Sequence, residues 1–414
     1  MSFADVLIVG GGHGGAQAAL ALRQRGFTGS IVMVTREAYP PYERPPLSKD
    51  YLAGTRPFEK MLIRPESFWS DREIDIRTRC AVMSIEPQLR SVELSDGSRL
   101  DYHTLIWAAG GNPRLLPCDG ADLDGVHAIR TRADVDRIRA QVDGGVKKVA
   151  VIGGGYIGLE AAAVFRTLGL PVTVIEREGR VLSRVAGPAL STFYEAEHRR
   201  QGVDLMLGYA VDALLGDEDG KVRAVSFTDA EGTAAEIEAD LVIVGIGIVP
   251  AVGPLLSAGA AGTNGVDVDP FCRTSLDDTY AIGDCAAHAN PYADNKVIRL
   301  ESVQNATDMA STVARHLTGE REPYETIPWF WSNQYDLRLQ TIGFSTEDDE
   351  AVIRGDPDTR SFSIVYLRDG GRVAAIDCVN STRDYAQGRR LIEARSVPDR
   401  DALADPDVAL KSLL

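Results

Sequence analysis

Residues 6–22 read VLIVGGGHGGAQAALAL, and residues 149–165 read VAVIGGGYIGLEAAAVF. In both stretches an apolar run typical of a buried strand enters a G-x-G-x-x-G pattern, and a helix-forming, alanine-rich run leaves it. Glycine lets backbone N–H groups and the positive end of the following helix approach a pyrophosphate. A single pattern of this kind also occurs in tight turns of ordinary α/β domains. Two in one chain, each between a strand and a helix, predict that the protein binds two dinucleotides.

The positions expected at the two dinucleotides follow from these patterns. His13, inside the first loop, is expected to contribute only its backbone, because N–H groups meet the phosphate. The expected residues are Gly10, Gly12, Gly14 and Gly15 in the first loop, Gly153, Gly155, Ile157 and Gly158 in the second, and Gly245 and Gly247 after a later apolar strand.

Length, composition and charge limit the class of protein. The 414 residues exceed what one hydrophobic core usually serves, so we expect two or three domains. No apolar run approaches the ~18 residues that span a bilayer, and no signal-peptide pattern is present, which predicts a cytoplasmic protein without a membrane partner. The net charge of −16 disfavours nucleic acid. Five cysteines without a C-x-x-C pair predict neither a metal site nor a dithiol relay.

Strand-like and helix-like segments alternate through the first 200 residues, which predicts parallel sheets with crossover helices. Residues 203–239 change to short alternating segments with turn signals and predict an antiparallel excursion. From about Glu325 onward, aromatic and β-rich runs predict a third, mixed domain that closes with an amphipathic helix near residues 384–394.

The strand that follows each loop suggests which dinucleotide is bound. Glu176 lies 18 residues beyond Gly158, where a carboxylate can accept hydrogen bonds from both ribose hydroxyls and repel a 2′-phosphate. This favours NADH over NADPH, although a rotated Arg177 could meet a phosphate. After the first loop, Arg36 takes the usual acidic position, or Glu37 takes it displaced by one; either could contact an adenosine.

Four runs in order carry a family resemblance: RPPLSK at 44–49, GGGYIGLE at 153–160, YAIGDC at 280–285 and WFWSNQY at 329–335. With these runs the chain resembles the NADH-dependent, FAD-containing ferredoxin reductases of bacterial oxygenase systems. The resemblance implies a glutathione-reductase-like α/β fold with two Rossmann-type domains and a C-terminal α+β domain. It assigns residues 1–115 and 250–324 to FAD, 116–249 to NADH and 325–414 to a C-terminal interface domain. Arg36, where relatives usually carry an acidic residue, and Ala108-Ala109-Gly110, in place of Ala-Thr-Gly, depart from the family pattern.

The reactive positions are implied by the same resemblance. Lys49 is either an ordinary surface lysine or an ammonium that stabilises the negative charge of reduced flavin. The resemblance favours the second role and pairs Lys49 with Glu160. It places Tyr156 where an aromatic ring covers the flavin until nicotinamide displaces it, and Trp331 at the flavin edge where a protein partner docks. Ordinary helix or core packing is the alternative for these two aromatic residues.

Further cofactor-lining positions come mainly from the resemblance. Asp284 follows a strand that ends in glycine, so it can bind the ribityl hydroxyls while the N-terminus of the next helix approaches the pyrophosphate; a helix N-cap is the compatible alternative. The resemblance implies a backbone contact at Val82, a phosphate contact at Arg130, Val303 under the flavin ring and Glu301 facing the nicotinamide amide. The remaining implied positions are Arg44, Pro46, Ala109 and Gly110.

The expected cofactors define an electron path. Nicotinamide gives two electrons together, an iron–sulfur protein accepts one at a time, and flavin is stable at both levels. The chain offers no cluster ligands, so we expect electrons to pass from NADH through FAD to a [2Fe–2S] ferredoxin that supplies an oxygenase. Ferredoxins are usually acidic, which requires a basic dock. Its candidates, each otherwise an ordinary solvated residue, are Arg338, Arg383, Arg389, Arg390 and Lys411.

Three other functions share parts of this pattern. A disulfide, peroxide or coenzyme A-disulfide reductase needs a reactive cysteine, and residues 38–50, where it is normally found, contain none. A flavin monooxygenase would need no protein acceptor. A redox-sensing protein like apoptosis-inducing factor would bind nucleic acid, against which the negative charge argues.

Overall fold

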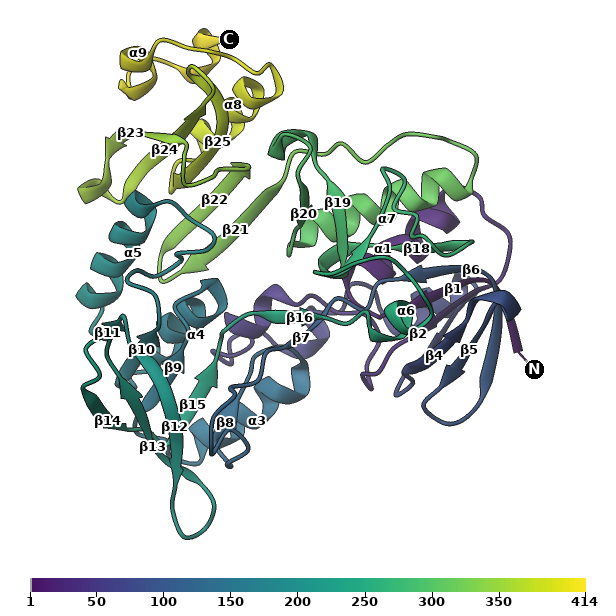
Figure 1. Ribbon diagram of the computed structural model, residues 1–414, viewed down its shortest axis with the longest axis horizontal. Coiled ribbons are helices and arrows are strands. Elements are labelled where there is room, and N and C mark those ends of the chain that lie inside the picture. Colours follow the sequence, from purple (N-terminus) through teal and green to yellow (C-terminus); the bar gives the residue numbers. More distant parts are fainter. Residues whose placement is uncertain (1) are drawn as a thin grey trace. The chain divides into compact units, whose positions relative to one another are not determined.

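The computed structural model describes residues 2–414, and the chain divides into two compact units (Figure 1). The first unit comprises the residues up to Arg44, Phe58–Asn112 and Val249–Phe330. The second comprises Pro45–Pro57, Pro113–Ile248 and Trp331–Leu414. Within residues 2–414, none of the helices has both the length and the apolar character needed to cross a bilayer.

The first unit is built on a seven-stranded sheet of order β3-β2-β1-β6-β5-β4, in which β18 pairs with β6. Strands β3, β2, β1, β6 and β18 run parallel, whereas β5 and β4 add an antiparallel edge. The strands are β1 (Ser2–Val9), β2 (Ile31–Val34), β3 (Ile74–Arg77), β4 (Val82–Glu86), β5 (Ser91–Leu94), β6 (Arg99–Trp107) and β18 (Thr279–Ala281).

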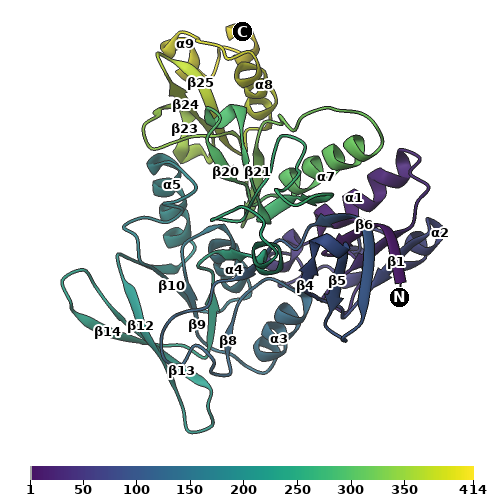
Figure 2. The same ribbon diagram turned by 45° about the vertical axis from the view of Figure 1, so that its right-hand side comes forward.

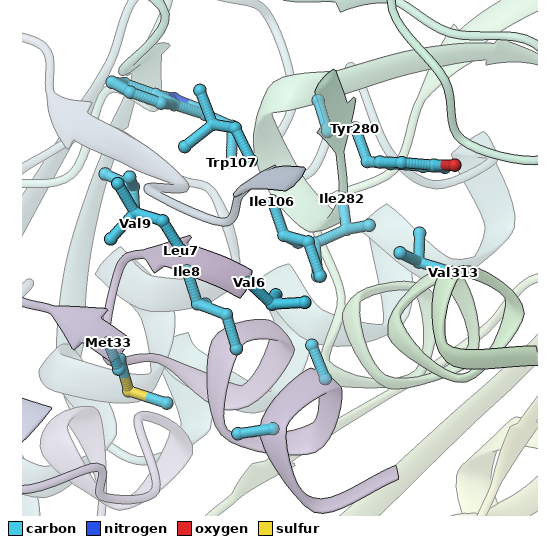
Figure 3. Close-up of a cluster of buried hydrophobic side chains, with 14 of the residues drawn as sticks. Val6, Leu7, Ile8, Val9, Met33, Ile106, Trp107, Tyr280, Ile282 and Val313 are labelled. Atoms are coloured by element: carbon cyan, nitrogen blue, oxygen red, sulfur yellow. The ribbon is translucent and has the colours of Figure 1, made fainter. Parts of the chain in front are cut away.

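Apolar strands form the core of this unit (Figure 3). Val6, Leu7, Ile8 and Val9 of β1 are all buried, as expected for a parallel strand that is covered on both faces. Helices α1 (His13–Gln24) and α7 (Val303–Leu317) pack against each other (Figure 1). A Cβ on Gly14 of α1 would lie 3.5 Å from the backbone oxygen of Ala306 on α7, so the two helices meet here at van der Waals distance.

The segment after β18 differs from the prediction. Asp284 does not cap a helix. It lies in a single 3₁₀ turn (Gly283–Cys285), which leads directly into strand β19 (Ala286–Ala289). The N-cap alternative for Asp284 was therefore wrong. The next helix is α7, and its N-cap is Ser302. Short elements complete the unit: β17 (Val266–Asp267), β20 (Val297–Arg299), α2 (Glu66–Asp71) and α6 (Gly253–Ser257).

The second unit contains a five-stranded parallel sheet of order β11-β10-β9-β15-β8. The predicted antiparallel excursion is present as β12-β13-β14, but its first predicted part, Val203–Leu207, joins the parallel sheet as β11. The elements are β8 (Val126–His127), α3 (Arg132–Asp143), β9 (Val149–Ile152), α4 (Tyr156–Thr167), β10 (Val172–Glu176), α5 (Pro188–Arg200), β11 (Val203–Leu207), β12 (Ala210–Gly216), β13 (Val222–Thr228), β14 (Ala234–Glu238) and β15 (Leu241–Val244). Strands β7 (Gly111–Pro113) and β16 (Ile248–Pro250) lie where the chain crosses between the units.

The C-terminal residues form an antiparallel sheet of order β21-β22-β25-β24-β23, which confirms the β-rich region expected from about Glu325. The expected closing helix is α8 (Thr382–Glu393), which packs on β22 and β25 (Figure 2). The other elements are β21 (Trp329–Gln334), β22 (Leu337–Gly343), β23 (Glu350–Asp356), β24 (Ser361–Arg368), β25 (Arg372–Val379) and α9 (Arg400–Ala404).

Candidate active site

The first glycine loop connects β1 to α1. Gly10 has φ +116°, and a Cβ there would lie 2.3 Å from the carbonyl oxygen of Ala108. A Cβ on Gly15 would lie 1.9 Å from the carbonyl oxygen of Gly10. Both glycines are thus required by the fold. Gly12 differs, because its φ is −88° and a Cβ built on it would meet no described atom within 4 Å.

The second loop, between β9 and α4, repeats this geometry. Gly153 has φ +104°, and a Cβ there would lie 2.6 Å from the carbonyl oxygen of Gly245. A Cβ on Gly158 would lie 2.1 Å from the carbonyl oxygen of Gly153. Gly155, with φ −78°, has only the Gly245 carbonyl oxygen near its Cβ position, at 3.9 Å.

Gly12 and Gly155 are the N-caps of α1 and α4, and the backbone N–H groups of a first helical turn attract an anion. Neither needs to be glycine for its own backbone conformation or for packing. The open space above each loop therefore fits a group that must approach the backbone closely, such as the pyrophosphate of a dinucleotide. Ala108 and Gly245 hold equivalent places, because their carbonyl oxygens lie closest to the Cβ positions of Gly10 and Gly153. Ala109, followed by Gly110, is therefore next to the first loop, whereas the Cβ position of Gly247 faces Arg184 and Arg114.

The acidic residue that the sequence predicts beside the second loop is Glu176. Glu176, the last residue of β10, accepts backbone hydrogen bonds from Gly154 at 2.6 Å and from Glu178 at 2.9 Å. A carboxylate has about four lone-pair sites, so acceptor capacity remains for a ribose. The strand register gives Thr35 the corresponding place at the first loop, since Val34 pairs with Val9 as Ile175 pairs with Ile152.

The two residues predicted for the first adenosine contact, Arg36 and Glu37, both have partners within the protein. The exposed Arg36 donates to Asn112 Oδ1 at 3.0 Å. Glu37 accepts from Tyr42 and pairs with Arg44. Burial lowers the pKa of Arg44, but Tyr42, Glu37 and Asp284 together raise it above its ordinary value. Arg44, Glu37 and Asp284 thus form one charged group in the first unit.

Arg299 was missed by the sequence analysis. It donates to the backbone carbonyl of Asp284 at 2.8 Å and pairs with Glu301 at 2.7 Å, so Asp284 and Glu301 are linked through it. No local pattern marks this arginine, because Asp284 lies 15 residues earlier, on a separate turn. Val303 begins α7, and the buried Val82 begins β4 in the same unit. Arg130 lies in the second unit, before the Thr131 cap of α3.

The second unit brings Lys49 and Glu160 together, as predicted. Lys49 follows a 3₁₀ turn (Pro45–Ser48), which includes Pro46, and its Nζ lies 2.5 Å from Glu160 Oε2. Glu160, on α4, is only 3% exposed. It accepts further hydrogen bonds from Ser48 Oγ at 2.5 Å and from Ser332 Oγ at 2.6 Å. A buried carboxylate is tolerated only when it is paired and hydrogen-bonded in this way.

Ser48 and Ser332 were not predicted. They lie 112 and 172 residues from Glu160 in the sequence, so no spacing rule connects them to it. Together with Lys49 they satisfy both carboxylate oxygens. This arrangement can hold a positive charge in a nearly water-free place.

Comparison with known proteins identifies the chain. Residues 4–310 match the family described as pyridine nucleotide-disulphide oxidoreductase, and residues 329–414 match reductase C-terminal. A 5,5'-dehydrodivanillate O-demethylase ferredoxin reductase subunit from Sphingobium sp. is 54% identical over 409 residues, 99% of this chain and 98% of the relative. A ferredoxin–NAD(P)(+) reductase from Sphingomonas sp. is 54% identical over 411 residues, 99% of this chain and 97% of the relative.

The protein belongs to the ferredoxin–NAD(P)+ reductases of bacterial oxygenase systems. The reductase also matches a chain in the crystal structure of the covalent putidaredoxin reductase–putidaredoxin complex, with a TM-score of 0.93 and 36% identity over 100% of this chain and 98% of that chain. The predicted family and the predicted fold, with two Rossmann-like sheets and a C-terminal reductase domain, are confirmed.

The half-buried Tyr156 and the buried Asp377 interact electrostatically in the reductase. Burial raises the pKa of Tyr156 well above its ordinary value, and the charges of Asp377 and Glu160 act in the same direction. Asp377, on β25, accepts from Tyr366 OH at 2.7 Å. Burial raises the pKa of Asp377 to about 6, although the hydrogen bond from Tyr366 opposes this shift.

Asp377→Asn is expected to stabilise the reductase increasingly as the pH rises from 4 to 7. Folding binds a proton to Asp377, because its folded pKa of about 6 exceeds the ordinary 3.8. The free energy of unfolding therefore falls through this window in the wild type, by up to about 3 kcal/mol, and not in the variant. Urea unfolding at pH 4.5 and pH 8 measures the difference. Asp384→Asn, which removes the partner of Arg354 in the same domain, is the control and should destabilise. An equal effect of Asp377→Asn at both pH values would contradict the assignment.

The remaining predicted positions lie at the edges of the second unit. Trp331 is half-buried on β21, next to Ser332, and Ile157 on α4 is 42% exposed. The residues predicted to form a basic docking surface lie on α8 and its neighbours in the C-terminal domain. Arg338, Arg383, Arg390 and Lys411 are exposed, and Arg389 pairs with Glu393.

Proposed function

We propose that the reductase oxidises NADH, uses FAD as its internal carrier and delivers single electrons to a [2Fe–2S] ferredoxin. The observation that carries the proposal is the repeated loop geometry, in which Gly12 and Gly155 each leave space at a helix N-terminus. FAD supplies the conversion between two-electron uptake and one-electron release. We further infer that residues 1–115 and 250–324 form the FAD domain, 116–249 the NADH domain and 325–414 the interface domain.

The chain's own residues would divide the work as follows. The loop after β1, with the group formed by Arg44, Glu37 and Asp284, would hold the FAD diphosphate and its sugars. The loop after β9 and Glu176 would hold NADH. Lys49, fixed by Glu160, would place an ammonium where negative charge develops on the ring.

The five cysteines support electron transfer to a protein over the disulfide reductase alternative. Cys80, Cys272, Cys285 and Cys378 are buried, and Cys118 is half-buried. Burial raises the pKa of each thiol, to about 12 for Cys285, so these residues are poor nucleophiles at neutral pH.

Stopped-flow mixing with NADH, followed by anaerobic titration with candidate ferredoxins, tests the proposal. The flavin absorbance should bleach with NADH and recover with ferredoxin in two one-electron equivalents. Transfer to every ferredoxin no faster than to a free dye would reject it.

Glu176→Gln is expected to reduce the preference for NADH over NADPH by about tenfold, equivalent to about 1.4 kcal/mol. The substitution removes the negative charge that repels a 2′-phosphate but keeps an oxygen for the Gly154 N–H. The measured quantity is the ratio of kcat/KM for the two nucleotides. Glu178→Gln, two residues further on, is the matched control; an unchanged ratio in Glu176→Gln would assign specificity to another residue.

A further inference from the structure

Behind the Lys49–Glu160 pair, polar side chains are hydrogen-bonded in series. Ser332 Oγ lies 2.6 Å from Glu160 Oε1, and Gln334 Nε2 lies 3.2 Å from Ser332 Oγ. Gln334 Oε1 lies 2.8 Å from His198 Nε2, and Tyr335 OH lies 3.1 Å from His198 Nδ1. The series joins α4, β21 and α5, all within the second unit.

The donors and acceptors of these groups allow the hydrogen bonds to point in only one direction along the series. A carboxylate can only accept, so Ser332 must donate its hydroxyl proton to Glu160. The free lone pair of Ser332 then accepts from the Gln334 amide N–H, which turns the amide oxygen toward His198. His198 must carry its proton on Nε2 to reach that oxygen, which leaves Nδ1 to accept from Tyr335.

Burial preserves the donor-to-acceptor direction of every hydrogen bond in the series. Glu160, Ser332, Gln334 and His198 are at most 3% exposed, and Tyr335 is half-buried. Burial lowers the pKa of His198 to about 4, despite the opposing effects of Gln334 and Glu197, so the ring is neutral at physiological pH. Hydrogen bonds that are linked in series at low dielectric polarise one another.

We propose that Ser332, Gln334, His198 and Tyr335 are positioning residues that form a one-directional hydrogen-bond relay to Glu160. The relay fixes Oε1 of Glu160, which leaves Oε2 to hold Lys49 and Ser48. Its benefit to electron uptake rests on the proposed function, because it acts through the place of Lys49. The direction of the relay does not depend on any cofactor role.

Charged and titratable groups surround both ends of the relay. Beside His198 lies Glu197, which is paired with Arg200 and Arg360, and Arg166 acts on Tyr335. The charge of Glu160 contributes to the raised pKa of Tyr156 and of Tyr194. Glu197 keeps its two arginine partners when Gln334 is changed, so the titration of His198 reports mainly on the relay.

The first test is the tautomer of His198 in the wild-type holoenzyme. The chain contains six histidines, so ¹⁵N labelling of imidazole gives few signals, and His198→Gln identifies one of them. The expected result is a neutral ring protonated on Nε2 between pH 5 and pH 9. A proton on Nδ1, or titration near pH 6.5, would overturn the relay, whatever the enzyme reduces.

The second test replaces the hydrogen-bond donor at residue 334 by an acceptor of the same shape. In Gln334→Glu the carboxylate cannot donate to Ser332 and favours a charged imidazole, so the His198 titration should rise by about 1–3 pH units. Gln340→Glu, at another buried glutamine in the same sheet, is the control and should leave the titration near pH 4. Equal titration in the two variants would contradict the relay.

The third test connects the relay to electron uptake. Ser332→Ala should slow flavin reduction by NADH about tenfold, shift the pH profile of this step and leave the KM for NADH nearly unchanged. Ser332→Thr, which keeps the hydroxyl, should restore the rate. If the tautomer is as expected but Ser332→Ala reduces at the wild-type rate, the relay exists and its link to electron uptake fails. If the protein binds no flavin, the proposed function fails and the tautomer still decides the relay.

Discussion

Gly12→Ala is expected to yield a folded protein that binds FAD about 100-fold more weakly, a loss of about 2.7 kcal/mol. Gly155→Ala should keep the flavin but raise the KM for NADH by a similar factor. A methyl group at either position meets no described atom closer than 3.9 Å, so the protein itself can accommodate it. The same methyl group would occupy the space through which a pyrophosphate approaches the backbone.

Flavin fluorescence titration and steady-state kinetics measure the two effects, and urea unfolding of the flavin-free protein measures stability. Gly253→Ala, at a position that is also open and lies in the first unit, is the control that should change neither. Gly15→Ala and Gly158→Ala provide the contrast, since their Cβ atoms would lie 1.9 and 2.1 Å from carbonyl oxygens and must distort the loops. Normal cofactor binding by Gly12→Ala and Gly155→Ala would show that these loops do not hold dinucleotides.

Lys49→Met is expected to destabilise the reductase by about 3–5 kcal/mol, because it leaves the carboxylate of Glu160 buried without its ion-pair partner. It should also slow flavin reduction by NADH about 100-fold, since the ammonium no longer stabilises developing negative charge. Urea unfolding and stopped-flow absorbance measure the two losses separately.

The double variant Lys49→Met/Glu160→Gln separates structure from chemistry. A neutral amide needs no cation. Its oxygen can accept from Ser332 in the place of Oε1, and its NH2 can donate to Ser48 Oγ in the place of Oε2, so most of the stability should return. The slow flavin reduction should remain. Recovery of the rate together with the stability would mean that Lys49 serves only to neutralise Glu160.

The sequence predicts those features that depend on local spacing. The two strand–glycine–helix patterns, the position of Glu176 at the end of β10 and the closing helix α8 each follow from periodicity or from fixed offsets. The pairing of Lys49 with Glu160 came from the family resemblance and is present in the structure. Their action on a flavin stays a prediction.

Features that depend on contacts between distant segments could not be predicted. Ser332, His198 and Asp377 become neighbours of the site only because the C-terminal sheet folds in the second unit with α4 and α5. The N-cap alternative for Asp284 failed for a related reason. Cys285 is fully buried there, and the chain continues as β19, which pairs with β17 and β20, so tertiary pairing overrides a local signal.

The thirteen-residue stretch Pro45–Pro57 has its own consequence, because it belongs to the second unit although its flanks on both sides belong to the first. A chimera that grafts residues 113–248 of one such reductase onto another would bring Glu160 from one parent and Lys49 from the other. The Lys49 ammonium and the Glu160 carboxylate would then form an ion pair only if the two parent proteins are compatible at this contact. Recombination of these enzymes should therefore succeed most often when Pro45–Pro57 comes from the same parent as the rest of the second unit.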